Sequence, residues 1–196
     1  MNDENNKIFE KPFKISKIIK KSLLNNLSNS KSKLEYSHRF NGRWENQYLD
    51  IDFVPEIKII LDFACQLGRK IINKALIIPN KRLGFQNNEF WFNVSNPGES
   101  TRWHDHKIKS RLSGVYYIKI PDKSGNIRFR YKNKDSYREW SLDAEENKMI
   151  LFNSDLEHCV EKNNSDEKRI SLAFNLYTFP ISWLQSLESN SISKFY

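Results

Sequence analysis

The sequence lacks most of the features that mark special classes of protein. It has only two cysteines, Cys65 and Cys159, in unrelated contexts, which excludes a disulfide framework or a cysteine metal cluster. No apolar run approaches the roughly 18 residues of a membrane-spanning helix. Residues 1–6 lack the basic start and apolar block of a signal peptide. We therefore expect a cytoplasmic protein with reduced thiols and no membrane association.

The chain is basic, with 32 lysines and arginines against 24 aspartates and glutamates and a formal net charge of +8. Basic surface alone is weak evidence for nucleic-acid binding. No basic stretch is interleaved with aromatic residues in the manner of a base-stacking surface. We expect a small-molecule or peptide substrate rather than a nucleic acid, and the sequence leaves the oligomeric state open, a dimer included.

Two amphipathic helices are predicted in the first 84 residues. Apolar residues recur at helical spacing from Ile15 to Leu27, with lysines on the opposite side. Pro55 opens a second helix, whose apolar face continues to about Leu76. Residues 1–12 are expected to be frayed, residues 31–54 to be loop with one short strand at most, and residues 181–187 to form a last short helix.

After residue 84 the pattern changes to short strands separated by turns. Eight strands at regular spacing are typical of a jelly roll, and we predict them at 90–95, 102–106, 113–120, 126–131, 138–142, 148–153, 157–161 and 168–177. Residues 163–166 predict a hairpin turn between the last two. We expect one domain of mainly β structure with flanking helices (α+β): helical support at 1–84, a cupin-like double-stranded β-helix at 85–178 and a C-terminal tail at 179–196.

Three of the four histidines fall into one pattern, His104-Asp105-His106 followed by His158. Residues i and i+2 of a strand project from the same face, so His104 and His106 are expected to lie side by side. Neutral imidazoles are good ligands for late first-row divalent metals. The pattern predicts a metal site to which His158 contributes from a later strand.

Arg169 and Ser171 are also two residues apart on a predicted strand. A guanidinium offers a planar fork of donors, and a neighbouring hydroxyl adds another. The pair is a candidate clamp for the carboxylate of an acidic cosubstrate.

The stretch from Phe90 to Tyr177 resembles the iron(II)- and 2-oxoglutarate-dependent oxygenases. It is most similar to a branch that combines an aromatic-Asn strand, a turn, His-x-His, Ser-Gly-Val-Tyr-Tyr, a later His and Arg-x-Ser. In that order the motifs here are Trp91-Phe92-Asn93-Val94, Asn96-Pro97-Gly98, His104-Asp105-His106, Ser113-Gly114-Val115-Tyr116-Tyr117, Leu156-Glu157-His158-Cys159-Val160 and Arg169-Ile170-Ser171. The motifs are specific as a set and cover about half of the chain.

The resemblance implies that iron(II) binds to the histidines and that 2-oxoglutarate chelates the iron, with its other carboxylate on Arg169 and Ser171. It also implies that O2 is consumed, that 2-oxoglutarate is converted to succinate, and that a C–H bond is oxidised, usually by hydroxylation. We therefore expect a dioxygenase, an oxidoreductase.

The residue two positions after His104 departs from the superfamily, which usually has Asp or Glu there. Three ligand sets are compatible with the sequence: His104, His106 and His158; Asp105 turned inward by a bulge in place of His106; or two histidines with water or halide. We favour the first, because a regular strand directs Asp105 away from the metal. Lys107 replaces the proline that usually follows, which predicts a different rim.

Further residues are expected near the cavity. Asn93 and Tyr116 are candidates to contact the cosubstrate, and Trp91, Trp103 and Arg111 to border the substrate. Two other functions are compatible with the sequence: a three-histidine, cupin-like metalloenzyme that needs no 2-oxoglutarate, and a non-catalytic module that uses its basic N-terminal helix for binding.

Overall fold

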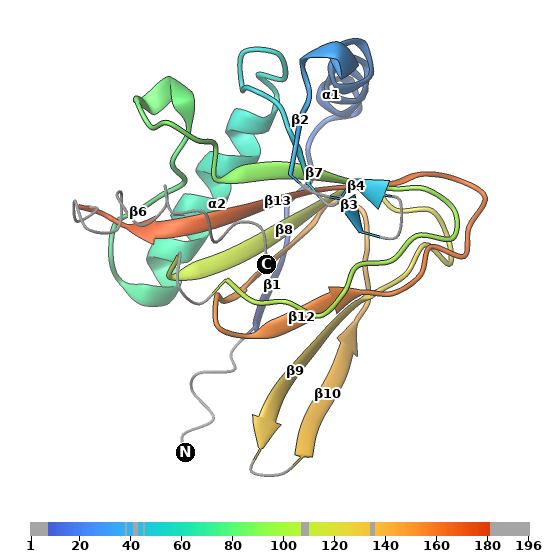
Figure 1. Cartoon of the computed structure of the whole chain (residues 1–196). Coiled ribbons are helices and arrows are strands. Elements are labelled where there is room, and N and C mark those ends of the chain that lie inside the picture. The colour runs from blue at the N-terminus through green and yellow to red at the C-terminus, as the bar shows by residue number, and fades with distance from the viewer. Residues whose placement is uncertain are drawn as a thin grey trace.

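The computed structural model describes residues 8–37, 39–40, 43–44, 46–106, 110–133 and 136–180 of the chain (Figure 1). Its helices are α1 (Lys17–Asn29) and α2 (Ile57–Ile72), with single 3-10 turns at η2 (Lys31–Lys33) and η3 (Lys81–Leu83). Its strands are β1 (Ile8–Pro12), β2 (Glu35–Tyr36), β3 (Arg39–Phe40), β4 (Arg43–Trp44), β5 (Gln47–Tyr48), β6 (Leu76–Ile77), β7 (Phe90–Ser95), β8 (Leu112–Lys119), β9 (Ile127–Asn133), β10 (Ser136–Leu142), β11 (Lys148–Asn153), β12 (Glu157–Val160) and β13 (Arg169–Thr178).

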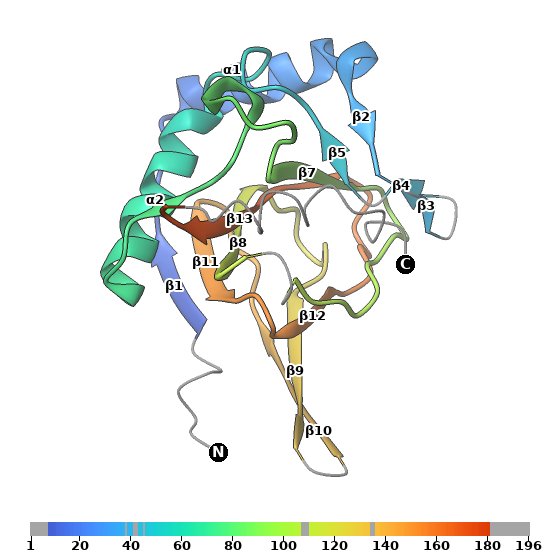
Figure 2. The ribbon, with the colours of Figure 1, turned by 60° about the vertical axis from the view of Figure 1, so that its left-hand side comes forward.

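Two antiparallel sheets form the jelly roll that the strand pattern predicted. The larger has eight strands in the order β1-β11-β8-β13-β7-β5-β2, with β6 paired to β13, and the smaller has the order β10-β9-β12. Figure 2 shows both helices outside the larger sheet, with β12 and β9 opposite its inner side. The β9–β10 hairpin extends away from the body. The chain therefore has the expected double-stranded β-helix fold.

The helices stabilise the larger sheet by covering its outer face. Leu23 and Leu27 of α1 and Ile60 of α2 are buried in one cluster with outer-face residues of β7, β8, β11 and β13. Ser16 caps α1 by accepting a hydrogen bond from the Ile19 N–H at 3.2 Å. In α2, a Cβ at Gly68 would lie 2.5 Å from the side chain of Leu76, so glycine allows the close approach of helix and strand.

Strict alternation along β8 separates the two faces of the larger sheet. Tyr116 and Ile118 belong to the cluster under the helices, whereas Val115 and Tyr117 pack on the inner side with residues of the smaller sheet. Both faces are buried, as expected for a central strand between two layers. The inner side is where a cavity opens.

Several predictions of local structure were wrong. Residues 8–12 are not frayed but form β1, which pairs with β11. Residues 102–106 form no strand but a single antiparallel bridge between His104 and His158. The last two strands are no hairpin, because β12 pairs with β9 while β13 pairs with β7 and β8, so the turn at 163–166 crosses between sheets. The predicted helix at 181–187 lies outside the described residues. None of the described helices is long and apolar enough to cross a membrane.

Candidate metal centre

The three predicted histidines come together at the inner side of the jelly roll. One ring nitrogen from each of His104, His106 and His158 lies within 4.8 Å of the others. Ring centroids are 5.2 Å apart for His104 and His106, 4.3 Å for His104 and His158, and 5.4 Å for His106 and His158. Among the described residues this group contains no carboxylate, so Asp105 is not part of it.

Backbone pairing fixes the positions of these residues. The His104 N–H donates to the His158 carbonyl at 3.0 Å, and the His158 N–H donates back at 2.9 Å. The His106 N–H donates to the Ser154 carbonyl at 2.7 Å. The short segment before β8 is therefore attached both to β12 and to the turn between β11 and β12.

Two of the rings are also oriented through their Nδ1 atoms. Nδ1 of His104 lies 2.9 Å from the Arg102 carbonyl, and Nδ1 of His158 lies 3.0 Å from the Leu156 carbonyl. A carbonyl can only accept, so the proton of each neutral ring sits on Nδ1 and the lone pair on Nε2. This arrangement is common for metal-binding histidines, because the second hydrogen bond holds the ring in its ligating orientation.

Burial keeps His158 neutral. Removal from water, followed by the neighbouring imidazoles of His104 and His106, holds its pKa well below the usual range, while the bond to the Leu156 carbonyl acts in the opposite direction. The rings of Phe152 and Phe129 pack on His158 at 4.7 and 6.2 Å between centroids. An uncharged imidazole in an apolar wall is ready to bind a cation without first losing a proton.

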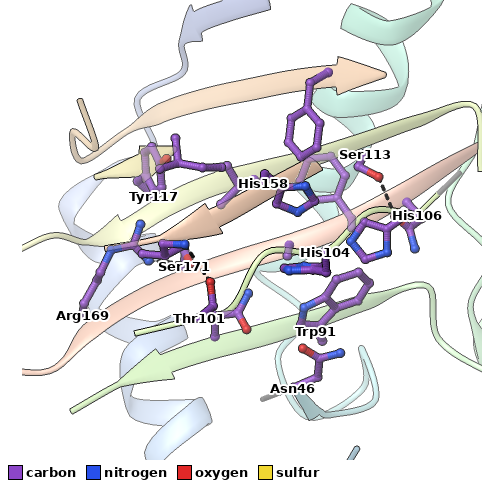
Figure 3. Close-up of a pocket in the computed structure, with 18 residues that line it drawn as sticks. Asn46, Trp91, Thr101, His104, His106, Ser113, Tyr117, His158, Arg169 and Ser171 are labelled. Atoms are coloured by element: carbon purple, nitrogen blue, oxygen red, sulfur yellow. Dashed lines mark hydrogen bonds between the residues drawn. The ribbon is translucent and has the colours of Figure 1, made fainter. Parts of the chain in front are cut away.

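The predicted carboxylate clamp lies in the same cavity. Arg169 and Ser171, at the start of β13, are buried, and the guanidinium Nη1 donates to the Ser171 hydroxyl at 3.2 Å. In Figure 3 they lie at the end opposite His106 and Ser113, with His104 and His158 between. The Arg169 guanidinium carbon is 5.2 Å from the ring centroid of Tyr117. Burial raises the pKa of the Tyr117 hydroxyl to about 12 against the lowering effect of the Arg169 charge.

Two of the other predicted site residues line the cavity and three lie elsewhere. Asn93 and Trp91 do line the cavity. Tyr116 does not: it faces the helices, where its hydroxyl donates to the Phe13 carbonyl at 2.9 Å. Trp103 and Arg111 are also outside the described lining.

A local feature explains why each of these three residues lies outside the cavity lining. The period of two along β8 turns Tyr117, not Tyr116, to the inner face. Trp103 packs instead under Arg130, whose guanidinium carbon lies 4.4 Å from its ring centroid. Arg111 is exposed, and its backbone N–H donates to the Leu176 carbonyl at 2.9 Å. Sequence reasoning missed Tyr117, Ser113 and Asn175, although alternation from Arg169 and Ser171 along β13 points to Asn175.

The described residues fit both a divalent metal and a dicarboxylate. Three imidazoles, two of them with rings held through Nδ1, are a donor set that a late first-row divalent ion accepts. At the other end a buried guanidinium lies beside two hydroxyls, those of Ser171 and Tyr117. No acidic side chain lines the cavity within the part of the chain that the structure describes. Its charge is therefore complementary to an anionic ligand.

Comparison with known proteins agrees with the resemblance found in the sequence. Residues 89–175 match the sequence model of a family described as "Putative 2OG-Fe(II) oxygenase". No curated protein is similar enough in sequence to match.

Solved structures share the fold at low sequence identity. A Pseudomonas putida prolyl-4-hydroxylase is 18% identical, with a TM-score of 0.63 over 89% of this chain and 94% of that one. SnoN, a non-heme alpha ketoglutarate dependent epimerase from nogalamycin biosynthesis, is 8% identical, with a TM-score of 0.67 over 89% of this chain and 77% of that one. A further structure of SnoN contains Fe3+, alpha ketoglutarate and nogalamycin RO.

Proposed function

We propose that the chain is an iron(II)- and 2-oxoglutarate-dependent oxygenase that hydroxylates a small molecule or a peptide, and the match of residues 89–175 to the oxygenase family model supports this. The observation that carries the proposal is the pairing, inside one cavity, of three histidines with a buried arginine-serine pair. Neither half alone would specify this chemistry, since a metal site without an anion clamp is compatible with many enzymes.

We assign the metal to Nε2 of His104 and His158 and to a ring nitrogen of His106. When bound, iron(II) and 2-oxoglutarate supply the oxidising power, with O2 consumed and 2-oxoglutarate converted to succinate. The protein's contribution is to present three imidazole donors, two of them in fixed orientations. The Arg102 and Leu156 carbonyls hold two of the rings through Nδ1.

Arg169 and Ser171 would hold a carboxylate of 2-oxoglutarate, and the tyrosine beside them is Tyr117 rather than Tyr116. A buried guanidinium interacts more strongly with a carboxylate than an exposed one, because little water screens the charges. Asn93 is the further candidate for contact with the cosubstrate, and it lies across the β7–β13 pair from Ser171.

Trp91 is the substrate-contacting residue that remains from the sequence prediction. Its ring is 5.7 Å from that of His106 and 6.1 Å from that of Tyr48 between centroids. It therefore forms an aromatic wall on the His106 side of the cavity, away from the Arg169 clamp. A substrate held against this wall would lie beside His106 and would leave the clamp free for the cosubstrate.

The proposal is tested with protein loaded with iron(II) in the absence of oxygen. Addition of 2-oxoglutarate should give a weak visible charge-transfer band, and admission of oxygen should then give succinate. Arg169→Ala should lose the band, whereas Arg111→Ala, which removes an exposed arginine outside the described lining, should keep it.

Fully loaded protein with neither band nor succinate would contradict the proposal. The alternative, a three-histidine metalloenzyme without 2-oxoglutarate, predicts metal binding with no calorimetric signal for 2-oxoglutarate. The buried Arg169–Ser171 pair favours the 2-oxoglutarate-dependent enzyme, because a metalloenzyme without 2-oxoglutarate would have no ligand for this clamp.

A further inference from the structure

A chain of side-chain hydrogen bonds runs along the inner wall of the larger sheet toward the metal centre. Asn175 Nδ2 donates to Glu89 Oε2 at 3.0 Å, and the Ser113 hydroxyl lies 3.0 Å from Asn175 Oδ1. The Ser113 and Ser154 hydroxyl oxygens are 3.3 Å apart, and those of Ser154 and Ser110 are 2.8 Å apart. All but Ser110 are buried, and Ser113 and Asn175 line the cavity.

Glu89 sets the orientation of the groups next to it. The Glu89 carboxylate only accepts, so the Asn175 amide must turn its NH2 toward Glu89 and its oxygen toward Ser113. The Ser113 hydroxyl is placed to donate both to that oxygen and to the Ser154 hydroxyl, and its single proton is shared between them. A buried carboxylate therefore orients the Asn175 amide and, through it, the Ser113 hydroxyl, and hydrogen bonds in series strengthen one another.

The turn between β11 and β12 connects this chain to the histidines. Ser154 lies in the turn, and its carbonyl accepts from the His106 N–H at 2.7 Å. Two residues later the Leu156 carbonyl lies 3.0 Å from Nδ1 of His158. One short turn thus holds the backbone of one histidine and the ring of another, and the Ser154–Ser113 contact anchors it to β8.

We propose that Glu89, acting through Asn175 and Ser113, is a positioning residue for the metal ligands His106 and His158. The inference rests on the proposed function, since it gives the three histidines their role. Glu89 does not line the cavity, so we assign its effect to the hydrogen-bonded path through Asn175, Ser113 and the turn. Its backbone reinforces the arrangement, because the Asn175 N–H donates to the Glu89 carbonyl at 2.9 Å.

The test measures binding of Co(II) alone, by titration and by its visible d–d bands, with thermal unfolding recorded for every variant. Ser113→Ala removes the hydroxyl in the middle of this series of hydrogen bonds. It should weaken Co(II) affinity by about 10-fold or more, as loss of an outer-shell partner does, and should change the bands. Ser113→Thr keeps the hydroxyl and should restore both. Ser124→Ala removes an equally buried serine hydroxyl outside this chain and should change neither.

Glu89→Gln provides a second measurement if Ser113→Ala does not fold. The amide oxygen can still accept from Asn175, so the affinity should fall in the same direction but by less. Wild-type affinity and bands in either folded variant would overturn the inference alone. Wild-type protein that takes up no Co(II) would overturn the proposed function, and this inference with it.

Discussion

His104 and His158 exchange two backbone hydrogen bonds, of 3.0 and 2.9 Å, and this pair is an isolated bridge rather than part of a strand. The contact brings their rings to 4.3 Å between centroids. The backbone thus sets the relative position of two candidate metal ligands that lie 54 positions apart (158 minus 104) in the sequence. Hydrogen bonds from Nδ1 to the Arg102 and Leu156 carbonyls then orient the two rings.

The identity of the third ligand can be tested by exchange of neighbouring residues. His106→Ala should weaken Co(II) affinity by more than the roughly 10- to 100-fold cost of an outer-shell change, because it removes a direct ligand. Asp105→Asn should leave affinity close to that of the wild type. His106→Asp should recover part of the loss, since it restores the carboxylate usual in the superfamily. A large loss in Asp105→Asn would show that Asp105 is the ligand.

Substitution of Arg169 should act on the cosubstrate and not on the metal. Arg169→Ala should weaken 2-oxoglutarate binding by roughly 10- to 100-fold, because a hydrogen bond to a charged group contributes about 1.5–3 kcal/mol. Arg169→Lys should recover only part of this, since it keeps the charge but loses the planar fork. Calorimetry with 2-oxoglutarate measures both, and equal Co(II) affinity in all three proteins is the control.

Tyr116 and Tyr117 provide a matched pair across one strand. Tyr117→Phe should weaken 2-oxoglutarate binding with little loss of stability. Tyr116→Phe should leave binding unchanged and lower the free energy of unfolding by about 1 kcal/mol, because its hydroxyl bonds to the Phe13 carbonyl and to Asn147 Oδ1 at 3.2 Å. Calorimetry and urea unfolding separate the two effects, and a reversed pattern would contradict the assignment of the faces.

The metal-free protein should become less stable as the pH is lowered. Because the pKa of His158 is lowered in the folded state, the unfolded chain binds a proton below about pH 6.5 that the folded chain does not. The free energy of unfolding should therefore decrease as pH falls, by up to about 1.4 kcal/mol per pH unit from this group. Urea unfolding with a metal chelator measures the slope, and His158→Gln should make it shallower. An unchanged slope would show that His158 is not kept neutral.

Most of the fold could be read from the sequence because its signals are local. The helical spacing of apolar residues predicted the two helices, and turn residues predicted the boundaries of β7 and β11. The strand β1 gave no such signal, since five residues with Lys11 and Pro12 gain order only by pairing with β11. The turn at 163–166 looked like a hairpin because turn residues say nothing about which sheet receives the next strand.

Site residues could be predicted from the sequence where an uncommon residue type occurs in a pattern. They could not be predicted where both faces of a strand are apolar. The three histidines of the His-x-His and later His pattern, and the Arg169–Ser171 pair on a predicted strand, could be picked out from the sequence. Tyr116 and Tyr117 are adjacent tyrosines in a strand buried on both sides, so hydrophobic alternation could not choose between them. The hydrogen bonds that start at Glu89 join residues as far apart in the sequence as 86 positions, so no local sequence pattern contains them.

The position of β1 determines how far the N-terminus can be shortened. Five residues, Ile8 to Pro12, cover the outer edge of β11, and Lys148 of β11 pairs with Glu10 at 3.1 Å. Removal of this segment would uncover a row of backbone donors and acceptors on a strand that is apolar from Met149 to Phe152. Such an edge is a template for pairing with another chain. A truncated protein starting at Phe13 should therefore aggregate, although the metal-binding residues would all still be present.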